Sequence, residues 1–296
     1  YFASKQVDIA VIETGLGGRL DSTNIIEPQL SIITSIGLDH MDFLGDTVEK
    51  IAREKAGIIK KDIPVILPQH LPEGTEQVFE TQAKKVNASV RKESKLYQVT
   101  SLGQEVSCMK GPQMVFSNLV MGIQGHHFYK NIPTIVESVI ALQELGYHIS
   151  QENLERGLQK IVTNTGLKGR WQRLSTSPDI IADVGHNEDG WKAIIKQVHA
   201  GKYRKLHFVL GVVQGKRINA ILDLLPFNAL YYLCEPKIKR ALPVEELADS
   251  VRKVGFSYTV CKDVNECISR AKAVAGPEDL IFVGGSTFVV AEIKDL

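Results

Sequence analysis

Residues 7–60 read VDIAVIETGLGGRLDSTNIIEPQLSIITSIGLDHMDFLGDTVEKIAREKAGIIK. This pattern predicts a strand over Val7–Thr14, a glycine-rich loop, a second strand over Leu30–Ile36 and a helix over Thr47–Lys60. Both predicted strands are short and rich in Ile and Val, as in a buried parallel sheet. Each is followed by polar or glycine residues at its carboxyl end, the edge at which parallel α/β sheets bind ligands. The stretch therefore indicates an α/β fold with a ligand site at that edge.

The same alternation continues along the first half of the chain. A strand over Ile63–Leu67 and a helix over Glu73–Asn87 extend it. Short segments punctuated by glycine at 90–122 predict an antiparallel β segment at the edge of the sheet. Two helices should follow, over Lys130–Leu145 and Ser150–Lys160. The second is expected to have only a partial cap, because the third helical position is not Glu.

A second run of strands and helices begins after the small, polar stretch at 163–169. Strands are expected at 180–183, 206–210, 230–234, 257–260 and 280–283, and helices at 188–200, 218–225, 244–254 and 264–274. This is another α/β layer structure with its own apolar strands. We therefore expect two domains, over residues 1–165 and 166–296.

Composition limits the partners. The 296 residues carry 35 Lys and Arg against 34 Asp and Glu, so no large electrostatic surface for nucleic acid or an anionic membrane is expected. The four cysteines have neither zinc-site spacing nor disulfide density, which favours the cytoplasm. No apolar run approaches the roughly 20 residues of a membrane span. The chain has no initiator Met and soon enters a predicted strand, so we expect a fragment of a longer protein.

Glu13 and His40 form the first group that could carry chemistry. Glu13 closes the first predicted strand and His40 follows the second, and neighbouring strands lie only about 5 Å apart. A carboxylate and an imidazole at this edge could share one ion, and open water positions would suit Mg²⁺. The alternative is a solvated strand-end acid beside a histidine that caps a helix. Lys55, on the helix that follows, would on pattern alone be a solvated surface charge.

The start of the second predicted domain holds another group. Arg170 offers a planar, permanently charged fork for phosphate oxygens. Asp183, at the end of the first strand, can accept hydrogen bonds from ribose hydroxyls. His186 and Asn187 lie where a helix amino end would face an anion. The alternative is a helix N-cap next to a purely structural aspartate.

Several motifs occur in a particular order. They are ETGLGGRLDSTN at 13–24, SIGLDH at 35–40, EKAGIIK at 54–60, GR at 169–170, DVGHN at 183–187 and GGS at 284–286. Together they resemble the folylpolyglutamate synthase / dihydrofolate synthase members of the Mur ligase superfamily, over essentially the whole chain. The first two motifs are the specific ones.

This resemblance implies an ATP-dependent amide ligase. Residues 1–165 would be the remainder of a central ATP-binding domain, and residues 166–296 a Rossmann-like C-terminal domain. ATP would phosphorylate a pteroate or folate carboxylate, and the α-amine of L-glutamate would attack the acyl phosphate. A carboxylate is a poor electrophile until its oxygen leaves as phosphate, and metals and Arg would meet the developing charge.

The resemblance also implies roles for single residues. Glu13 and His40 would bind Mg²⁺ with a carbamylated Lys55, which reverses the surface-charge interpretation of that lysine. Lys55 and His186 would be the catalytic residues. The remaining assignments are Asp21 and Ser22 in the pterin pocket, Asn131 near the adenine, Arg170 on the phosphates, Asp183 on the ribose, Asn187 in the nucleotide site, and His186 with Ser286 near the glutamate.

The chain departs from the family pattern in two places. The glycine-lysine-serine phosphate loop that precedes these motifs in the family is absent, so this polypeptide alone is expected to bind ATP poorly and to be inactive. The family's Gly-x-His-Gln segment reads GHHF at 125–128, so the Gln that precedes Asn131 in the family is lost. The expected partners are small molecules, namely ATP, L-glutamate and dihydropteroate or folate, and a monomer is expected from the relatives.

Three other functions compete with this interpretation. A peptidoglycan-precursor ligase of the same superfamily would share the metal and ATP chemistry, but the first two motifs favour the folate branch. A nicotinamide dehydrogenase would suit the α/β pattern, yet GLGG at 15–18 is not the G-x-G-x-x-G fingerprint. A non-catalytic remnant that only binds a partner is the third.

Overall fold

The structure, a computed structural model, describes residues 1–215, 218–261, 263–294 and 296, with only the backbone at 126 and 127. Contacts divide the chain into two units. The first comprises residues 1–100, 107–117 and 130–154, and the second comprises residues 101–106, 118–129 and 155–296. Each unit is described by itself below. The domain boundary after residue 165 stays a prediction.

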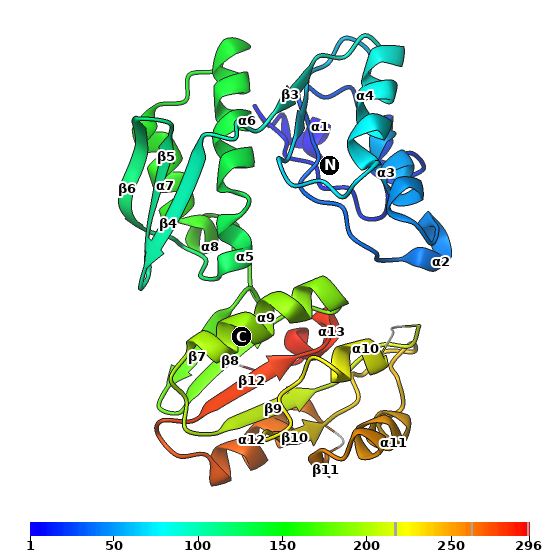
Figure 1. Ribbon diagram of the computed structural model, residues 1–296, viewed down its shortest axis with the longest axis vertical. Coiled ribbons are helices and arrows are strands. Elements are labelled where there is room, and N and C mark those ends of the chain that lie inside the picture. Colours follow the sequence, from blue (N-terminus) through cyan, green and yellow to red (C-terminus); the bar gives the residue numbers. More distant parts are fainter. Residues whose placement is uncertain (216–217, 262, 295) are drawn as a thin grey trace. The chain divides into compact units, whose positions relative to one another are not determined.

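The first unit is built on a three-stranded parallel sheet in the order β1-β2-β3 (Figure 1). Its strands are β1 (Ser31–Ile32), β2 (Val65–Leu67) and β3 (Val90–Lys92). Its helical segments are α1 (Phe2–Lys5), η1 (Ser22–Ile25), α2 (Met41–Leu44), α3 (Val48–Ala56), α4 (Thr75–Lys85) and α6 (Ile132–Glu144). The apolar core joins Ile51 of α3, Phe79 of α4 and Val65 of β2, so the expected layers of helix on sheet are confirmed.

The strand expected over Val7–Thr14 is wrong. The described residues at 7–14 join no sheet, and Val11 is 92% exposed. An apolar run forms a strand only where a neighbour completes its backbone hydrogen bonds, and β1, the strand expected beside it, is reduced to Ser31–Ile32. The reasoning that placed Glu13 and His40 on adjacent strand ends therefore fails at Glu13, which is exposed.

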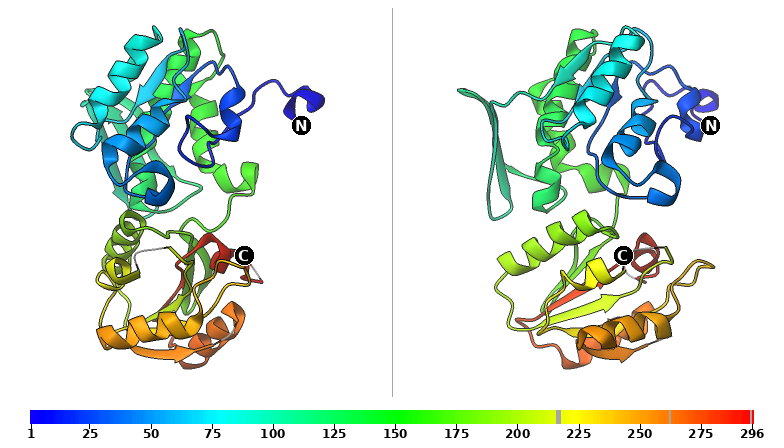
Figure 2. Two further views of the ribbon diagram at one scale, coloured as in Figure 1. Left: turned by 90° about the vertical axis from the view of Figure 1, so that its right-hand side faces the viewer. Right: turned by 45° about the vertical axis from the view of Figure 1, so that its right-hand side comes forward.

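A second sheet contains β4 (Tyr97–Leu102), β5 (Glu105–Lys110) and β6 (Gln113–Val120) in that order. Two residues join each pair, so the strands must be antiparallel, because parallel strands need long crossovers. Gly103 and Gly111 lie in these turns with φ of 61° and 58°, a region open to glycine without steric cost. The expected antiparallel segment is confirmed as a narrow ribbon, seen well in Figure 2. Its expected place at the edge of the parallel sheet is wrong, because β4, β5 and β6 form a sheet of their own.

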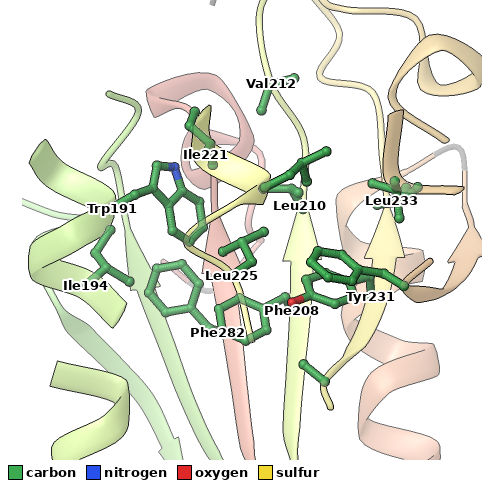
Figure 3. Packing of buried hydrophobic residues seen from close by; sticks show 14 of the residues in the cluster. Trp191, Ile194, Phe208, Leu210, Val212, Ile221, Leu225, Tyr231, Leu233 and Phe282 are labelled. Atoms are coloured by element: carbon green, nitrogen blue, oxygen red, sulfur yellow. The ribbon is translucent and has the colours of Figure 1, made fainter. Parts of the chain in front are cut away.

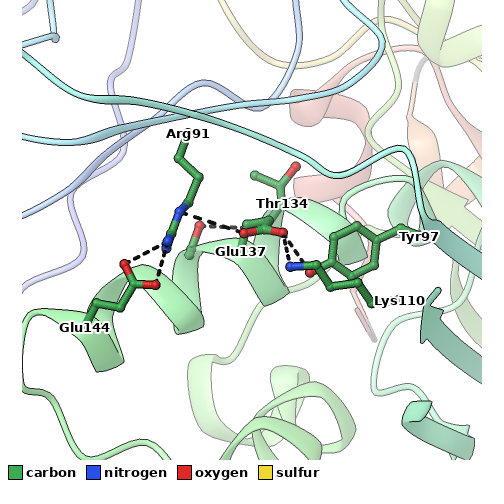
Figure 4. Close-up of polar contacts among 7 residues, drawn as sticks. Arg91, Tyr97, Lys110, Thr134, Glu137 and Glu144 are labelled. Carbon is green, nitrogen blue, oxygen red and sulfur yellow. Dashed lines mark hydrogen bonds and ion pairs between the residues drawn. The ribbon is translucent and has the colours of Figure 1, made fainter. Parts of the chain in front are cut away.

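A buried carboxylate fastens this ribbon to α6 (Figure 4). Glu137 is 4% exposed. It accepts hydrogen bonds from Lys110 Nζ at 2.7 Å and Tyr97 Oη at 3.0 Å, and Arg91 Nε lies 4.0 Å away. Because a buried charge is stable only when it is paired and hydrogen-bonded, Glu137 requires β3, β4 and β5 to lie where they do. The exposed Glu144 forms an ion pair with Arg91, in which Glu144 Oε1 lies 2.6 Å from Arg91 Nη2.

Helix α7 (Gln151–Gln159) has a more complete cap than expected. The Asn153 amide donates to Ser150 Oγ at 3.1 Å, and the Ser150 amide donates to Asn153 Oδ1 at 2.9 Å. Asn153 thus replaces the usual Glu in a reciprocal capping box. Helix α8 (Ile161–Thr165) follows and ends at Gly166 with φ of 67°, so part of the expected linker is helical.

The second unit holds a six-stranded sheet in the order β11-β10-β9-β12-β8-β7 (Figure 1). Its strands are β7 (Gln172–Thr176), β8 (Asp179–Asp183), β9 (Leu206–Leu210), β10 (Leu230–Leu233), β11 (Ser257–Val260) and β12 (Leu280–Gly284). Its helices besides α8 are α5 (His126–Tyr129), α9 (Glu188–Ala200), α10 (Ile218–Leu222), α11 (Val244–Val254), α12 (Val264–Val274) and α13 (Thr287–Ala291). All pairings are parallel except β7 with β8, and β7 is the one strand here that the sequence did not predict.

Alternate residues of the central strands face two separate cores. Phe208, Tyr231 and Phe282 pack with α9, α10 and α11 on one face, where Trp191 of α9 reaches the Phe282 ring at 5.6 Å (Figure 3). Val209 and Ile281 pack with α12 and α13 on the other. Strands buried on both faces read as continuous apolar runs, which is why they were predicted well. None of the described helices is long and apolar enough to cross a bilayer.

Candidate active site

The glycine loop of the first unit folds around Asp21. Its carboxylate accepts hydrogen bonds from the Leu16 amide at 2.8 Å, the Thr23 amide at 2.9 Å and Thr23 Oγ1 at 2.6 Å. These bonds lower the pKa of Asp21 to about 2. Asp21 also caps η1, which begins at Ser22. Asp21 therefore shapes the loop, and the roles of Asp21 and Ser22 toward a pterin stay predictions.

This loop lies directly on α3 and the turn after it. The Arg19 amide donates to the Glu54 carbonyl at 2.7 Å, and the two side chains pair at 2.9 Å. A Cβ at Gly57 would lie 2.3 Å from Arg19 Cα, and one at Gly18 would lie 2.8 Å from the Glu54 carbonyl oxygen. Both positions therefore leave no room for a side chain, and the packing of the loop on α3 requires glycine at each.

The SIGLDH motif places His40 in an unusual conformation. His40 precedes α2 with φ of 51°, and its amide donates to Asp39 Oδ1 at 2.8 Å. A histidine with positive φ is uncommon and costs conformational energy. Asp39 also acts electrostatically on Lys55: burial lowers the pKa of Lys55, and the Asp39 carboxylate partly opposes that shift. His40 and Lys55 were predicted from the sequence as site residues, whereas Asp39, which lies beside His40 in the same motif, was not.

The first unit places one of the expected metal ligands, Lys55, near the carboxylate of Asp39. Asp39 and the half-buried Lys55 interact, and His40 follows Asp39 directly. In the described part of this unit, no three ligand atoms of His, Cys, Asp or Glu lie within 4.8 Å of one another. An unmodified lysine supplies no carboxylate oxygen. Carbamylation of Lys55 would add such an oxygen ligand to the site. The role of Glu13 as a ligand stays a prediction.

Asn131 occupies the residue before α6. It is half-buried, and its side chain makes no capping hydrogen bond to that helix. Its amide group is thus not used by the helix terminus. The expectation that it lies near an adenine stays a prediction.

Asp183 is the centre of the expected group in the second unit. It is 3% exposed, and its two carboxylate oxygens accept hydrogen bonds from the Trp171 amide and the Gly185 amide, both at 2.8 Å. These bonds join the carboxyl end of β8 to the turn before β7. Asp183 has the structural role that the sequence left open as an alternative. Contact with a ribose stays a prediction.

Arg170 lies in that turn. Among the described residues it forms no hydrogen bond or ion pair. Its neighbour Trp171 has φ of 44°, a conformation that is strained for a bulky residue and that the Asp183 bond holds in place. Arg170 lines a cavity of ≈ 470 Å³ with Gln124, Trp171 and Gln197, and a phosphate role for it stays a prediction.

His186 and Asn187 lie between β8 and α9. Asn187 Oδ1 accepts from the Gly190 amide at 2.9 Å, so Asn187 is the N-cap of α9. His186 is half-buried, and its Nδ1 lies 3.1 Å from the Val184 carbonyl oxygen. If Nδ1 carries the proton, Nε2 is left as the basic nitrogen. The position of both residues at the sheet edge agrees with the prediction, and their ligands remain to be tested.

Ser286 follows β12 at the same edge. In the sheet, Gly284 pairs with Asp183, so the Ser286 segment and the His186 segment leave neighbouring strands. Ser286 is buried and caps α13, where its Oγ accepts from the Val289 amide at 3.2 Å. Gly285 has φ of 106°, and a Cβ there would lie 2.4 Å from the Gly211 carbonyl oxygen. The second unit thus gathers Arg170, Asp183, His186, Asn187 and Ser286 near one sheet edge.

Comparison with known proteins identifies the family. Residues 1–136 match the Mur ligase middle domain and residues 169–287 match the Mur ligase, glutamate ligase domain. The dihydrofolate synthase/folylpolyglutamate synthase of Bacillus subtilis is 30% identical over 308 residues, which cover 99% of this chain and 69% of that protein. The chain belongs to the dihydrofolate synthase/folylpolyglutamate synthase family of Mur ligases.

Solved structures of the family have the same fold. The Mycobacterium tuberculosis folylpolyglutamate synthase complexed with ADP matches 98% of this chain and 68% of its own, with a TM-score of 0.84 and 27% identity. A bifunctional folylpolyglutamate synthase/dihydrofolate synthase with Mn, AMPPNP and L-glutamate bound matches 94% of this chain and 64% of its own, with a TM-score of 0.75 and 26% identity. The expected α/β Mur ligase fold is confirmed, and the family places the chain among ATP-dependent ligases.

Proposed function

We propose that this chain carries out the ATP-dependent addition of L-glutamate to dihydropteroate, to tetrahydrofolate polyglutamate, or to both. One observation supports this most strongly: the alignment with the Bacillus subtilis folate ligase covers 99% of the chain. The related structure that holds AMPPNP with L-glutamate agrees with the proposed substrates. The folate relatives favour this branch over the peptidoglycan ligases and give no support to a nicotinamide dehydrogenase.

The proposed reaction proceeds through an acyl phosphate. The acceptor carboxylate attacks the γ-phosphorus of ATP and ADP leaves; the α-amine of glutamate then attacks the acyl carbon and phosphate leaves. Arg170, Asp183, Asn131 and Asn187 would bind the nucleotide, and Asp21 with Ser22 would bind the acceptor. His186 and Ser286 would bind the glutamate. Nε2 of His186, which is the basic nitrogen when Nδ1 donates to the Val184 carbonyl, could take the proton that the amine loses.

Mg²⁺ is the metal that we propose for this chain. Glu13, His40 and a carbamylated Lys55 would hold it, and Asp39 is a further oxygen donor in the same motif. When bound, Mg²⁺ would neutralise charge on the transferring phosphate. The lowered pKa of Lys55 favours carbamylation, because only the neutral amine adds to CO₂, forming an N–C bond and releasing one proton.

Replacement of Lys55 tests this proposal. In the intact enzyme, Lys55→Ala should lower kcat by at least about 10- to 100-fold, the range seen when groups that support a metal are removed. With ¹³C-bicarbonate, the wild-type enzyme should show a carbamate carbonyl signal by ¹³C NMR that Lys55→Ala lacks. Lys50→Ala is the matched control, because Lys50 lies on the same helix and its side chain pairs with the exposed Asp46. Near-normal turnover in Lys55→Ala would show that no carbamate is needed.

The substrate class is tested by offering different acceptors. ADP release by the intact enzyme should depend on L-glutamate together with dihydropteroate or tetrahydrofolate, and a UDP-MurNAc-peptide acceptor should give none. Turnover with the peptidoglycan acceptor alone would contradict the proposal. The remaining predictions are that the 296 residues assayed without a phosphate loop bind ATP weakly, and that the enzyme is a cytoplasmic monomer.

A further inference from the structure

The loops after β9 and β10 are fastened to each other at the carboxyl edge of the six-stranded sheet. The Gln214 amide donates to the Arg240 carbonyl at 2.9 Å, and the Leu242 amide donates to the Val212 carbonyl at 3.0 Å. Val213 and Ala241 form an antiparallel bridge between these two bonds. The backbone of Arg240 is therefore fixed on both sides, although its side chain is exposed.

The side chain of Arg240 reaches a third loop, the one after β12. Its guanidinium lies 5.2 Å from the centre of the Phe288 ring, within the range of a cation–π contact. Phe288 follows Ser286 by two residues. The close approach of Gly285 to Gly211 also brings the β9 and β12 loops together. Arg240 is thus held beside the segment to which the proposed function assigns the glutamate.

Arg240 carries a charge that no carboxylate of the described residues neutralises. Within residues 1–215, 218–261, 263–294 and 296, no carboxylate forms an ion pair with it. Four other arginines of the second unit do have such partners: Arg173 with Asp179, Arg204 with Asp279, Arg252 with Asp249, and Arg270 with Glu266. A guanidinium that is held in place by an aromatic ring but left without an anion is suited to an anionic ligand.

We propose that Arg240 binds a carboxylate of the incoming L-glutamate and so helps to determine amino-acid specificity. This inference rests on the proposed function. A free glutamate has two carboxylates, and neither reacts, since its amine is the nucleophile; each therefore needs a cationic or hydrogen-bonding partner. The fork of Arg240 matches the planar carboxylate in a two-point contact that Lys would make less well.

Steady-state kinetics of the intact enzyme test the proposal. Arg240→Met should raise KM for L-glutamate by about 10- to 100-fold, as expected for a lost charged hydrogen bond, while KM for ATP stays within about twofold. Arg240→Lys should show a smaller rise because it keeps the charge. Lys239→Met is the control, since it removes a neighbouring exposed cation. Circular dichroism should show the same fold in all variants.

The acceptor distinguishes the incoming glutamate from the glutamyl tail of a folate. With dihydropteroate, which has no glutamyl tail, the rise in KM for glutamate should persist. A rise confined to glutamylated acceptors would overturn the proposal, and so would a KM for glutamate within twofold of wild type in Arg240→Met. A wild-type enzyme that forms no product with glutamate would instead overturn the proposed function.

Discussion

His207 is a buried imidazole at the amino end of β9, away from the sheet edge that carries the candidate site. It is 1% exposed. Its Nε2 lies 3.5 Å from Asp279 Oδ2 but forms no hydrogen bond among the described residues, and its Nδ1 lies 3.3 Å from Tyr232 Oη. Burial lowers the pKa of His207, with Lys205 acting in the same direction and Asp279 opposing it. The folded protein therefore keeps this imidazole neutral.

This burial predicts a dependence of stability on pH. Below about pH 6.5, the ordinary pKa of histidine, the unfolded chain binds a proton that folded His207 resists. The free energy of unfolding should thus fall as the pH drops towards the lowered pKa, by at most about 1.4 kcal/mol per pH unit for one proton. Urea unfolding of wild type and His207→Gln between pH 5 and 8 measures this. Equal slopes in the two proteins would contradict the prediction, and His199→Gln, an exposed histidine, is the control.

For the second unit, the sequence predicted where the site residues lie, but it did not predict their hydrogen bonds. Asp183, Asn187 and Ser286 were expected at strand ends, and they lie there. Their hydrogen bonds to the backbone of Trp171, Gly190 and Val289 depend on how each turn closes, and a linear pattern does not contain that geometry. Arg240 was not predicted for the same reason. Its proposed role depends on the contact with Phe288, which lies 48 residues later in the sequence.

At the scale of elements, the attachment of the β4–β6 ribbon to α6 depends on Glu137. Glu137→Ala should lower the free energy of unfolding by about 2 kcal/mol, because two hydrogen bonds to a charged group are lost and the half-exposed Lys110 can turn to water. Glu144→Ala is the control: the Glu144 side chain is 59% exposed, and a surface pair contributes about 1 kcal/mol or less. Urea titration checks both, and equal losses in the two variants would contradict the prediction.

Elements were predictable where both faces of a strand are covered. Strand β9 and helices α9, α11 and α12 have the expected bounds, because a continuous apolar run between two helical layers has one stable arrangement. Strand β11 also has the expected bounds, although it is an edge strand and mostly exposed. Residues 7–14 have a similar apolar composition, but no neighbouring strand pairs with them in the described structure. They therefore form no strand. β7 was missed because its burial is partial and its pairing with β8 is antiparallel.

Across the whole protein, the reactivity of the four cysteines should show whether the two units unfold together or separately. All four are buried, and burial raises the pKa of Cys108 to about 11 and of Cys261 to about 12. Thiolate is the reactive form, so labelling of the native protein by a disulfide reagent should be at least about 100-fold slower than in denaturant, because it requires opening.

Mass spectrometry of the labelled protein shows which unit opens. Cys108 belongs to the first unit, and Cys234, Cys261 and Cys267 belong to the second. Labelling of all four together indicates a single cooperative opening, and labelling of Cys108 alone indicates separate ones. Ser269→Cys supplies an exposed reference thiol on α12. A native cysteine that reacts as fast as this reference would contradict the predicted protection.

The bare backbone crossing of Gly285 and Gly211 limits how this enzyme could be re-engineered. Since even one methyl group would intrude there, the loop after β9 and the loop that bears Ser286 have little room to shift independently. The loop that bears Arg240 is hydrogen-bonded to the loop after β9. Remodelling one of these loops to change amino-acid specificity would therefore disturb the others. A successful redesign would have to exchange the three loops together.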